Sequence, residues 1–206
     1  MRLGVISDLH ADAGALARAF DVLERRGADR VVCLGDTVEK GDDGDRVVDE
    51  LRAHAVACVR GNHDEGAARA HREGWAERPL RDDTAQWLEA LPRVRSYVWE
   101  GVRVTLAHGT PSVIDEYVFP DKVPKRFRRE LRAHEGDLLL LGHTHRPMSL
   151  RAGHVWVVNP GSVAVGRSRD SHSCALLDLR RREVAFHDLA TGDAFPVRET
   201  SLSAKE

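Results

Sequence analysis

Residues 2–10 of the chain read RLGVISDLH, a short apolar run that ends in acidic and imidazole side chains. The pattern repeats twice, because residues 30–36 read RVVCLGD and residues 55–64 read AVACVRGNHD. Between these runs, residues 14–26 and 45–54 carry apolar side chains at helical spacing. The order strand-helix-strand-helix-strand predicts a parallel sheet covered by helices, since parallel neighbours need crossover connections.

The second half of the chain has a different pattern. A short helix over 84–91 precedes strands at 94–99 and 102–107, which only Glu100-Gly101 separates, a hairpin signal. A basic helix over 125–134 follows. The remaining strand candidates are residues 138–141, 148–151, 154–158, 174–179 and 183–187. We therefore expect an α/β fold in which two mixed sheets face each other with helices outside. One domain over 1–190 and a loose polar tail over 191–206 complete the prediction.

The composition limits the classes of function that the chain can have. The 206 residues fit one domain, and 42% hydrophobic residues suffice for a core. Lysine and arginine total 31 against 33 acidic residues, which argues against nucleic-acid binding by bulk positive charge. An acidic ligand must therefore be held by a local site.

Cysteines and the N-terminus indicate the compartment. The three cysteines form no C-x-x-C pair, and their odd number fits reduced, buried thiols. Asp8, His10 and Asp12 stand where a signal peptide needs uninterrupted apolar residues. No stretch reaches 18 apolar residues. We expect a cytoplasmic protein that does not enter the membrane.

Metal-competent side chains follow five of the apolar runs. They are Asp8, His10, Asp36, Asn62, His63, His108, His143 and His145. Each motif alone could be a turn or a helix cap. The segment 142–145 is stronger, because imidazoles at positions i and i+2 of an extended segment point to the same side. Ligands of α/β sheets bind beyond the carboxyl ends of the strands, so these side chains are predicted to converge on one site.

In this order, the motifs resemble the calcineurin-like metallophosphoesterases. The family pattern is Asp-x-His, Gly-Asp, Gly-Asn-His-Asp/Glu, a His, and Gly-His-x-His, and every element is present over roughly residues 1–165. The spacing and the sequence Asn159-Pro160-Gly161-Ser162 resemble the small bacterial and archaeal phosphodiesterase branch. The resemblance implies a four-layer α-β-β-α sandwich, which matches the element order above.

The resemblance also implies a dinuclear metal centre. One metal would be held by Asp8, His10, Asp36 and His145, and a second by Asp36, Asn62, His108 and His143. Nitrogen and oxygen donors without thiolate favour divalent transition metals, with manganese preferred here and iron, nickel, cobalt or zinc as alternatives. A hydroxide bridging the metals would be the nucleophile.

By the same resemblance, His63 acts on the leaving group, as a general acid or as a cation. Asp64 would bond the other nitrogen of His63 and fix its tautomer. A helix N-cap before residues 65–72 is the alternative role of Asp64.

Charged segments near these motifs carry weaker predictions. The basic segment 122–132 is either a solvated helix face or a rim that attracts phosphate. Arg60 and the turn 167–169 could add to such a rim. The acidic segment 39–46 does not match a calcium loop and is interpreted as a solvated turn.

We therefore expect a dinuclear-metal phosphodiesterase that acts on a small or nucleotide-type substrate. A phosphomonoesterase is the alternative enzyme. A binding scaffold, like the retromer subunit that shares the family fold but lacks key catalytic residues, is disfavoured because every motif is complete here. The neutral charge also argues against a nuclease. The expected partner is a small phosphorylated substrate, and a homo-oligomer is left open.

Overall fold

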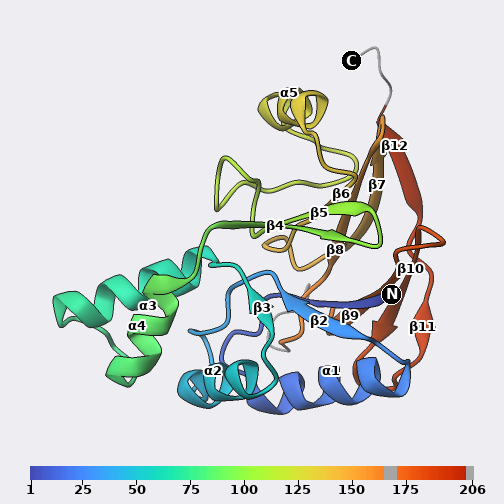
Figure 1. Ribbon diagram of the computed structural model, residues 1–206. Helices are drawn as coiled ribbons and strands as arrows, with labels where there is room; N and C mark the ends of the chain where they lie inside the picture. The colour runs from blue at the N-terminus through green and yellow to red at the C-terminus, as the bar shows by residue number, and fades with distance from the viewer. Residues whose placement is uncertain (165–170, 203–206) are drawn as a thin grey trace.

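Two six-stranded sheets lie face to face in the computed structural model, which describes residues 1–164 and 171–202 (Figure 1). The helices are α1 (Ala13–Arg25), α2 (Gly44–Ala53), α3 (Asn62–Glu73), α4 (Asp82–Ala90) and α5 (Lys125–Ala133). The strands are β1 (Arg2–Ile6), β2 (Arg30–Cys33), β3 (Ala57–Cys58), β4 (Val94–Trp99), β5 (Val102–Ala107), β6 (Leu138–Leu140), β7 (Pro147–Ala152), β8 (Val155–Pro160), β9 (Ser173–Asp178), β10 (Glu183–Asp188), β11 (Ala194–Phe195) and β12 (Glu199–Leu202).

Each sheet mixes parallel and antiparallel strands. The first sheet has the order β11-β10-β9-β1-β2-β3, in which β1, β2 and β3 are parallel, as the repeated strand-helix pattern predicts. The second has the order β12-β7-β8-β6-β5-β4, with β5, β6 and β8 parallel. The expected hairpin forms between β4 and β5, with Val94 opposite Ala107.

The layers follow from the alternation of side chains along each strand. Leu3 and Val5 of β1 pack between the sheets, whereas Ile6 packs with α1 and α2. On the far side, Phe127 and Leu131 of α5 pack on the outer face of the second sheet. Figure 1 shows α1 and α2 below the sheets and α5 above them. The expected four-layer α-β-β-α sandwich is confirmed.

The end of the chain is not the loose tail expected from its polarity. β11 pairs with β10 in the first sheet, and β12 pairs in parallel with β7 in the second. Glu199 accepts hydrogen bonds from Ser149 and Arg151, so polar side chains fix this edge strand. Up to residue 202, the described tail is therefore part of the sheets.

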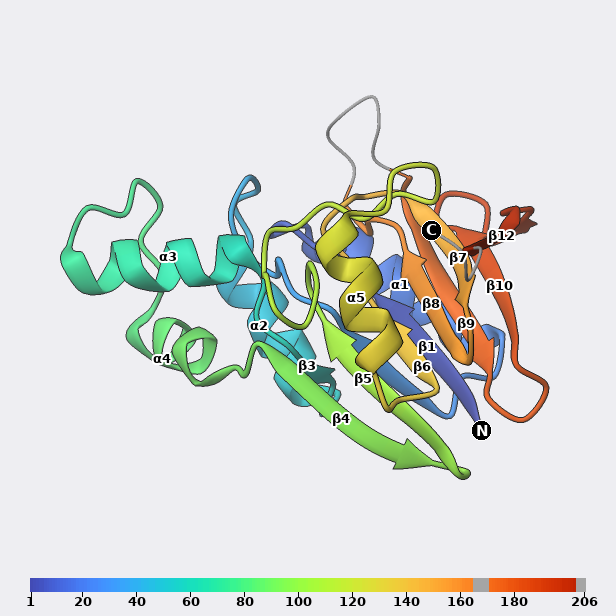
Figure 2. The ribbon, with the colours of Figure 1, turned by 90° about the horizontal axis from the view of Figure 1, so that it is seen from above.

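The parallel strands bring the predicted site residues to one edge. The segments after β1 and β2 stay paired, since the amides of Asp8, His10 and Ala11 donate to the carbonyls of Gly35, Asp36 and Thr37. α3 begins at the same edge and, with α4, extends away from the sheets (Figure 2). Within the described ranges, no helix has the length and apolar character needed to cross a membrane.

Candidate metal centre

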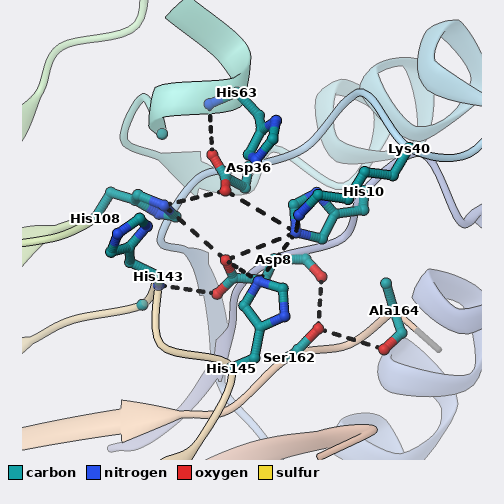
Figure 3. Close-up of polar contacts among 12 residues, drawn as sticks. Asp8, His10, Asp36, Lys40, His63, His108, His143, His145, Ser162 and Ala164 are labelled. Atoms are coloured by element: carbon teal, nitrogen blue, oxygen red, sulfur yellow. Dashed lines mark hydrogen bonds and ion pairs between the residues drawn. The ribbon is translucent and has the colours of Figure 1, made fainter. Parts of the chain in front are cut away.

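Two carboxylates and four imidazoles from distant segments meet at the strand ends, and a fifth imidazole, that of His63, lies close to His10 and Asp36 (Figure 3). Asp8 and His10 follow β1, Asp36 follows β2, and His108 follows β5. The turn after β6 supplies the remaining pair, His143 and His145. All six are buried or nearly so, with His145 the most exposed at 14% of its side chain.

The first donor group consists of Asp8, His10 and His145, whose potential ligand atoms lie within 4.8 Å of one another. Oδ1 of Asp8 lies 3.2 Å from Nε2 of His145, and Nε2 of His10 lies 3.1 Å from that same nitrogen. Oδ2 of Asp36 lies 4.0 Å from Nε2 of His10. These are the residues predicted for one metal.

The second donor group consists of Asp36, His108 and His143. Oδ2 of Asp36 lies 3.2 Å from Nε2 of His108, so the same carboxylate oxygen faces both groups. Asn62, predicted for the second metal, stands at the first residue of α3, where its Oδ1 is buried. The structure thus places Asp36 between the two predicted ligand sets.

Backbone carbonyls fix which nitrogen of each second-group imidazole carries the proton. Nδ1 of His108 donates to the carbonyl of Leu34 at 2.7 Å, so Nε2 is the nitrogen that faces Asp36 and that can bind a metal once it has lost its proton. The ring of His143 likewise donates to the carbonyl of Asp115. Such a second bond orients a ligand imidazole and raises its basicity.

The electrostatics hold Asp8, Asp36, His10 and His143, but not His108, in forms that bind cations. Burial opposes ionisation of Asp36 and Asp8, but neighbouring imidazoles keep the pKa of both carboxyls below the usual range. Burial lowers the pKa of His10 to about 4 and also lowers the pKa of His143. Burial has the same effect on His108, but Asp36 and Asp8 outweigh it and raise its pKa to about 9. Displacing that proton from His108 would accompany metal binding.

The residues present fit divalent transition metals. Oδ1 of Asn62 and Nε2 of His143 are buried and make no hydrogen bond to any part of the chain that the structure describes. Unpaired buried polar atoms are costly, and a cation would satisfy both. The donor set of oxygen and imidazole nitrogen without thiolate suits first-row metals.

The backbone of the site is strained. Asp8, His10, Asp36, His143 and His145 all have positive φ, between 46° and 67°. This left-handed conformation costs a non-glycine residue roughly 1–3 kcal/mol.

Close packing at the site also depends on two glycines. A Cβ at Gly61 would lie within 2.1 Å of Oδ1 of Asp36. A Cβ at Gly142 would lie 2.0 Å from Oγ of Ser7. The glycines of the two motifs therefore allow the ligand loops to approach each other.

Asp64 does not contact His63 in the predicted way. Its carboxylate instead accepts hydrogen bonds at 2.7–3.3 Å from the amides of Gly61, Asp36, Thr37 and Val38 and from the hydroxyl of Thr37. The alternative interpretation is met only in part: Asp64 makes a capping interaction with Gly61, but α3 begins at Asn62, so Gly61 is the N-cap and Asp64 is the third residue of the helix. Asp64 holds the Asp36 loop against α3.

We expect Asp64→Ala to lower the free energy of unfolding by about 3 kcal/mol or more, because several buried amides lose their acceptor. Urea unfolding of the metal-free protein measures this change. Asp64→Asn, which keeps one acceptor oxygen, should fall between the wild type and Asp64→Ala. An Asp64→Ala protein of normal stability and metal content but slow turnover would instead support the catalytic role.

The partner of His63 is Glu39, which the sequence interpretation missed. Oε2 of Glu39 lies 2.5 Å from Nδ1 of His63, and the ring of His63 packs edge-on against His10 at 5.1 Å. Nζ of Lys40 lies 2.7 Å from Nε2 of His10. Segment 39–46 is therefore not merely a solvated turn, because its first two residues reach the site. The available signal was their position three and four residues after Asp36.

The remaining charged candidates lie differently. Arg60 turns toward α3 and α4, where it donates to the carbonyl of Glu89 and pairs with Glu65 at 3.6 Å. This position does not support the predicted contact of Arg60 with substrate. In the basic segment, Lys125, Arg126 and Arg129 are exposed, which agrees with a solvated helix face. The turn 167–169 lies outside the described residues.

Known proteins share both the sequence pattern and the fold. Residues 1–182 match the calcineurin-like phosphoesterase superfamily domain. The chain is 29% identical over 196 residues to uncharacterized protein MJ0912 of Methanocaldococcus jannaschii, covering 82% of this chain and 77% of that protein. It is 28% identical over 189 residues to phosphodiesterase YfcE of Escherichia coli, covering 86% and 88%. A crystal structure of a metallophosphoesterase from Sphaerobacter thermophilus aligns with a TM-score of 0.73 at 26% identity, covering 96% of this chain and 90% of that one.

Proposed function

Because the chain belongs to the calcineurin-like phosphoesterase superfamily, we propose that it is a dinuclear-metal phosphodiesterase acting on a small or nucleotide-type substrate. The observation that carries the proposal is Asp36, whose Oδ2 faces imidazoles of both donor groups. One carboxylate shared in this way can hold two cations together. The similarity to YfcE, a phosphodiesterase, supports a diester substrate.

In this proposal Asp8, His10, Asp36 and His145 hold one cation, and Asp36, Asn62, His108 and His143 hold the other. When bound, the pair supplies Lewis-acid stabilisation of the phosphoryl oxygens and an activated water. Manganese is our preferred metal, with iron, nickel, cobalt or zinc as alternatives.

His63 is proposed to give a proton to the leaving-group oxygen. Its side chain is 30% exposed, so it is open to substrate, and Glu39 fixes its orientation through Nδ1. That contact leaves Nε2 to face the ester oxygen. The ammonium of Lys40, beside His10, adds positive charge that attracts the phosphate.

Two alternatives remain distinct from this proposal. A phosphomonoesterase would use the same residues on a terminal phosphate. A scaffold would need no proton donor, and the Glu39–His63 pair argues against it. We place the enzyme in the cytoplasm, as its free, buried cysteines suit a reducing compartment.

Metal removal tests the proposal. We expect purified protein to carry two transition-metal ions per chain, to lose hydrolysis of bis(p-nitrophenyl) phosphate on chelation and to regain it with Mn²⁺. The melting temperature should rise on reloading, because the ions bind only the folded chain. Elemental analysis gives the stoichiometry, with Mg²⁺ reloading as the control. Active protein with one ion or none would refute the dinuclear mechanism.

A further inference from the structure

An exposed aromatic ring borders the second donor group. The side chain of Tyr117 is 56% exposed, yet its ring lies 4.1 Å from the ring of His143, centre to centre. Among the described residues, the other large apolar side chains with comparable exposure are Trp75 and Val98. Tyrosine is enriched at contact surfaces, because its ring offers an apolar face and its hydroxyl stays in water.

Tyr117 is part of a row of planar groups that leads away from the second donor group. Its ring lies 6.1 Å from that of Phe119 and nearly parallel to it, at 15°. The guanidinium of Arg146 lies 5.4 Å from the centre of the Phe119 ring. Since His143 begins the row and Arg146 ends it, both ends belong to the turn that carries the predicted ligands.

The segment that bears Tyr117 is held in place. Val118, which lies between Tyr117 and Phe119 in the sequence, is buried and packs in one cluster with Phe127 of α5. The amides of Thr110 and Val113 bond each other's carbonyls, and the ring of His143 donates to Asp115. The ring of Tyr117 is therefore presented to solvent by an ordered loop, which lowers the entropic cost of stacking a ligand on it.

We propose that Tyr117 is a specificity-determining residue on which the flat organic group of the phosphodiester, a nucleobase or an aryl ring, stacks while the phosphate lies at the donor groups. This inference rests on the proposed function. Stacking on an aromatic face suits any base, because every base has a π-face. The structure thus assigns a nucleoside or aryl diester as the preferred substrate class.

The group that stacks on Tyr117 is the ester substituent that stays bonded to phosphorus after hydrolysis. His63, assigned to the leaving group, packs against His10, whereas Tyr117 packs against His143 (Figure 3 labels the three histidines). The proton donor and the stacking ring therefore serve different substituents of the ester. Hydrolysis would release the alcohol on the His63 side and leave a nucleoside monophosphate on the Tyr117 side.

The other exposed aromatic ring suits this role less well. Trp75 lines a cavity of about 620 Å³ whose wall also includes Glu39, Asp42, Asp45 and Glu77. Lys40 and Arg78 also line this cavity, but the four carboxylates outnumber these two cations and disfavour a phosphate ester there. Trp75 is therefore a matched control for Tyr117.

The test compares two diesters with the same leaving group, thymidine 5′-(p-nitrophenyl phosphate) and methyl p-nitrophenyl phosphate. Wild-type enzyme should prefer the thymidine ester. Tyr117→Ala should lower kcat/KM for that ester by about tenfold and leave the methyl ester unchanged within about twofold, as loss of one stacked base implies. Tyr117→Phe should keep the preference, and Trp75→Ala should not alter it.

Two further measurements separate loss of stacking from disturbance of His143 and from effects on turnover. Tyr117→Leu keeps bulk against His143 without a π-face, so it should keep both metals and the methyl activity but lose the thymidine preference. Binding of thymidine 5′-monophosphate, measured by calorimetry without turnover, should weaken by about tenfold in Tyr117→Ala.

The outcomes separate the two proposals. If wild-type enzyme hydrolyses neither ester but binds the nucleotide through Tyr117, the proposed function fails and the stacking role stands. If Tyr117→Ala leaves both the ester preference and nucleotide binding unchanged, the stacking role is overturned. It is also overturned if Trp75→Ala, and not Tyr117→Ala, removes the preference.

Discussion

Asp36→Asn protein is expected to hold at most one metal ion and to lose hydrolysis by about 10³-fold or more, since both cations lose a ligand. The substitution is nearly isosteric, and the new amide oxygen can still accept the bond that the amide of His63 gives to Oδ1 of Asp36. The loss should therefore come from the Oδ2 that faces His10 and His108. Elemental analysis and turnover should fall together.

The control for this prediction is a residue of one donor group only. His145→Ala removes a ligand from the Asp8 group and leaves the His108 group complete. It should retain one ion, and a high concentration of metal should restore part of its activity. Asp36→Asn enzyme with two ions and near-normal turnover would show that Asp36 is not shared.

His63→Ala protein should keep both metals while its turnover falls by about 10²- to 10⁴-fold, the usual contribution of a positioned acid. The metals should stay because the side chain of His63 is not among the predicted ligands. In addition, its link to Asp36 runs through the backbone amide, which alanine retains. The measurement is kcat/KM on diesters with alkoxide and with nitrophenolate leaving groups.

The leaving group decides how His63 acts. Nitrophenolate needs little protonation, so the penalty of His63→Ala should shrink with that substrate if His63 gives a proton. Glu39→Gln is the companion variant: it should retain the metals and lower turnover less than His63→Ala does, because Oε2 of Glu39 contacts Nδ1 of His63 and not a predicted ligand. A His63→Ala protein that loses a metal, or that cleaves both esters at the wild-type rate, would remove His63 from the mechanism.

Local sequence patterns predicted most of the fold. The apolar runs ending at Asp8 and Asp36 became the parallel strands β1 and β2, and the hairpin at 94–107 formed as expected. Those signals are local, since strand period and turn residues lie within a few positions. The polar β12 was missed because an edge strand obtains its stability from a distant partner, here β7.

The site was predictable where motif and strand end coincide. Asp8, His10, Asp36, His108, His143 and His145 converge because parallel strands end at one edge. The partner of His63 was not predictable in this way. Asp64 is adjacent to His63 in sequence, but helical geometry directs its carboxylate to the Asp36 loop, and Glu39 reaches His63 from 24 positions away.

The backbone is left-handed at five of the seven predicted ligand positions, such as Asp8 and His145. This strain affects which substitutions the stability of the fold would favour at these positions. Glycine adopts this conformation without the steric cost of a Cβ, so glycine at these positions would relieve backbone strain while it deletes a donor. A lineage not selected for the proposed hydrolysis would thus gain stability from changes that remove the predicted metal ligands. Rebuilding the centre would require each strained residue to be restored against that gain.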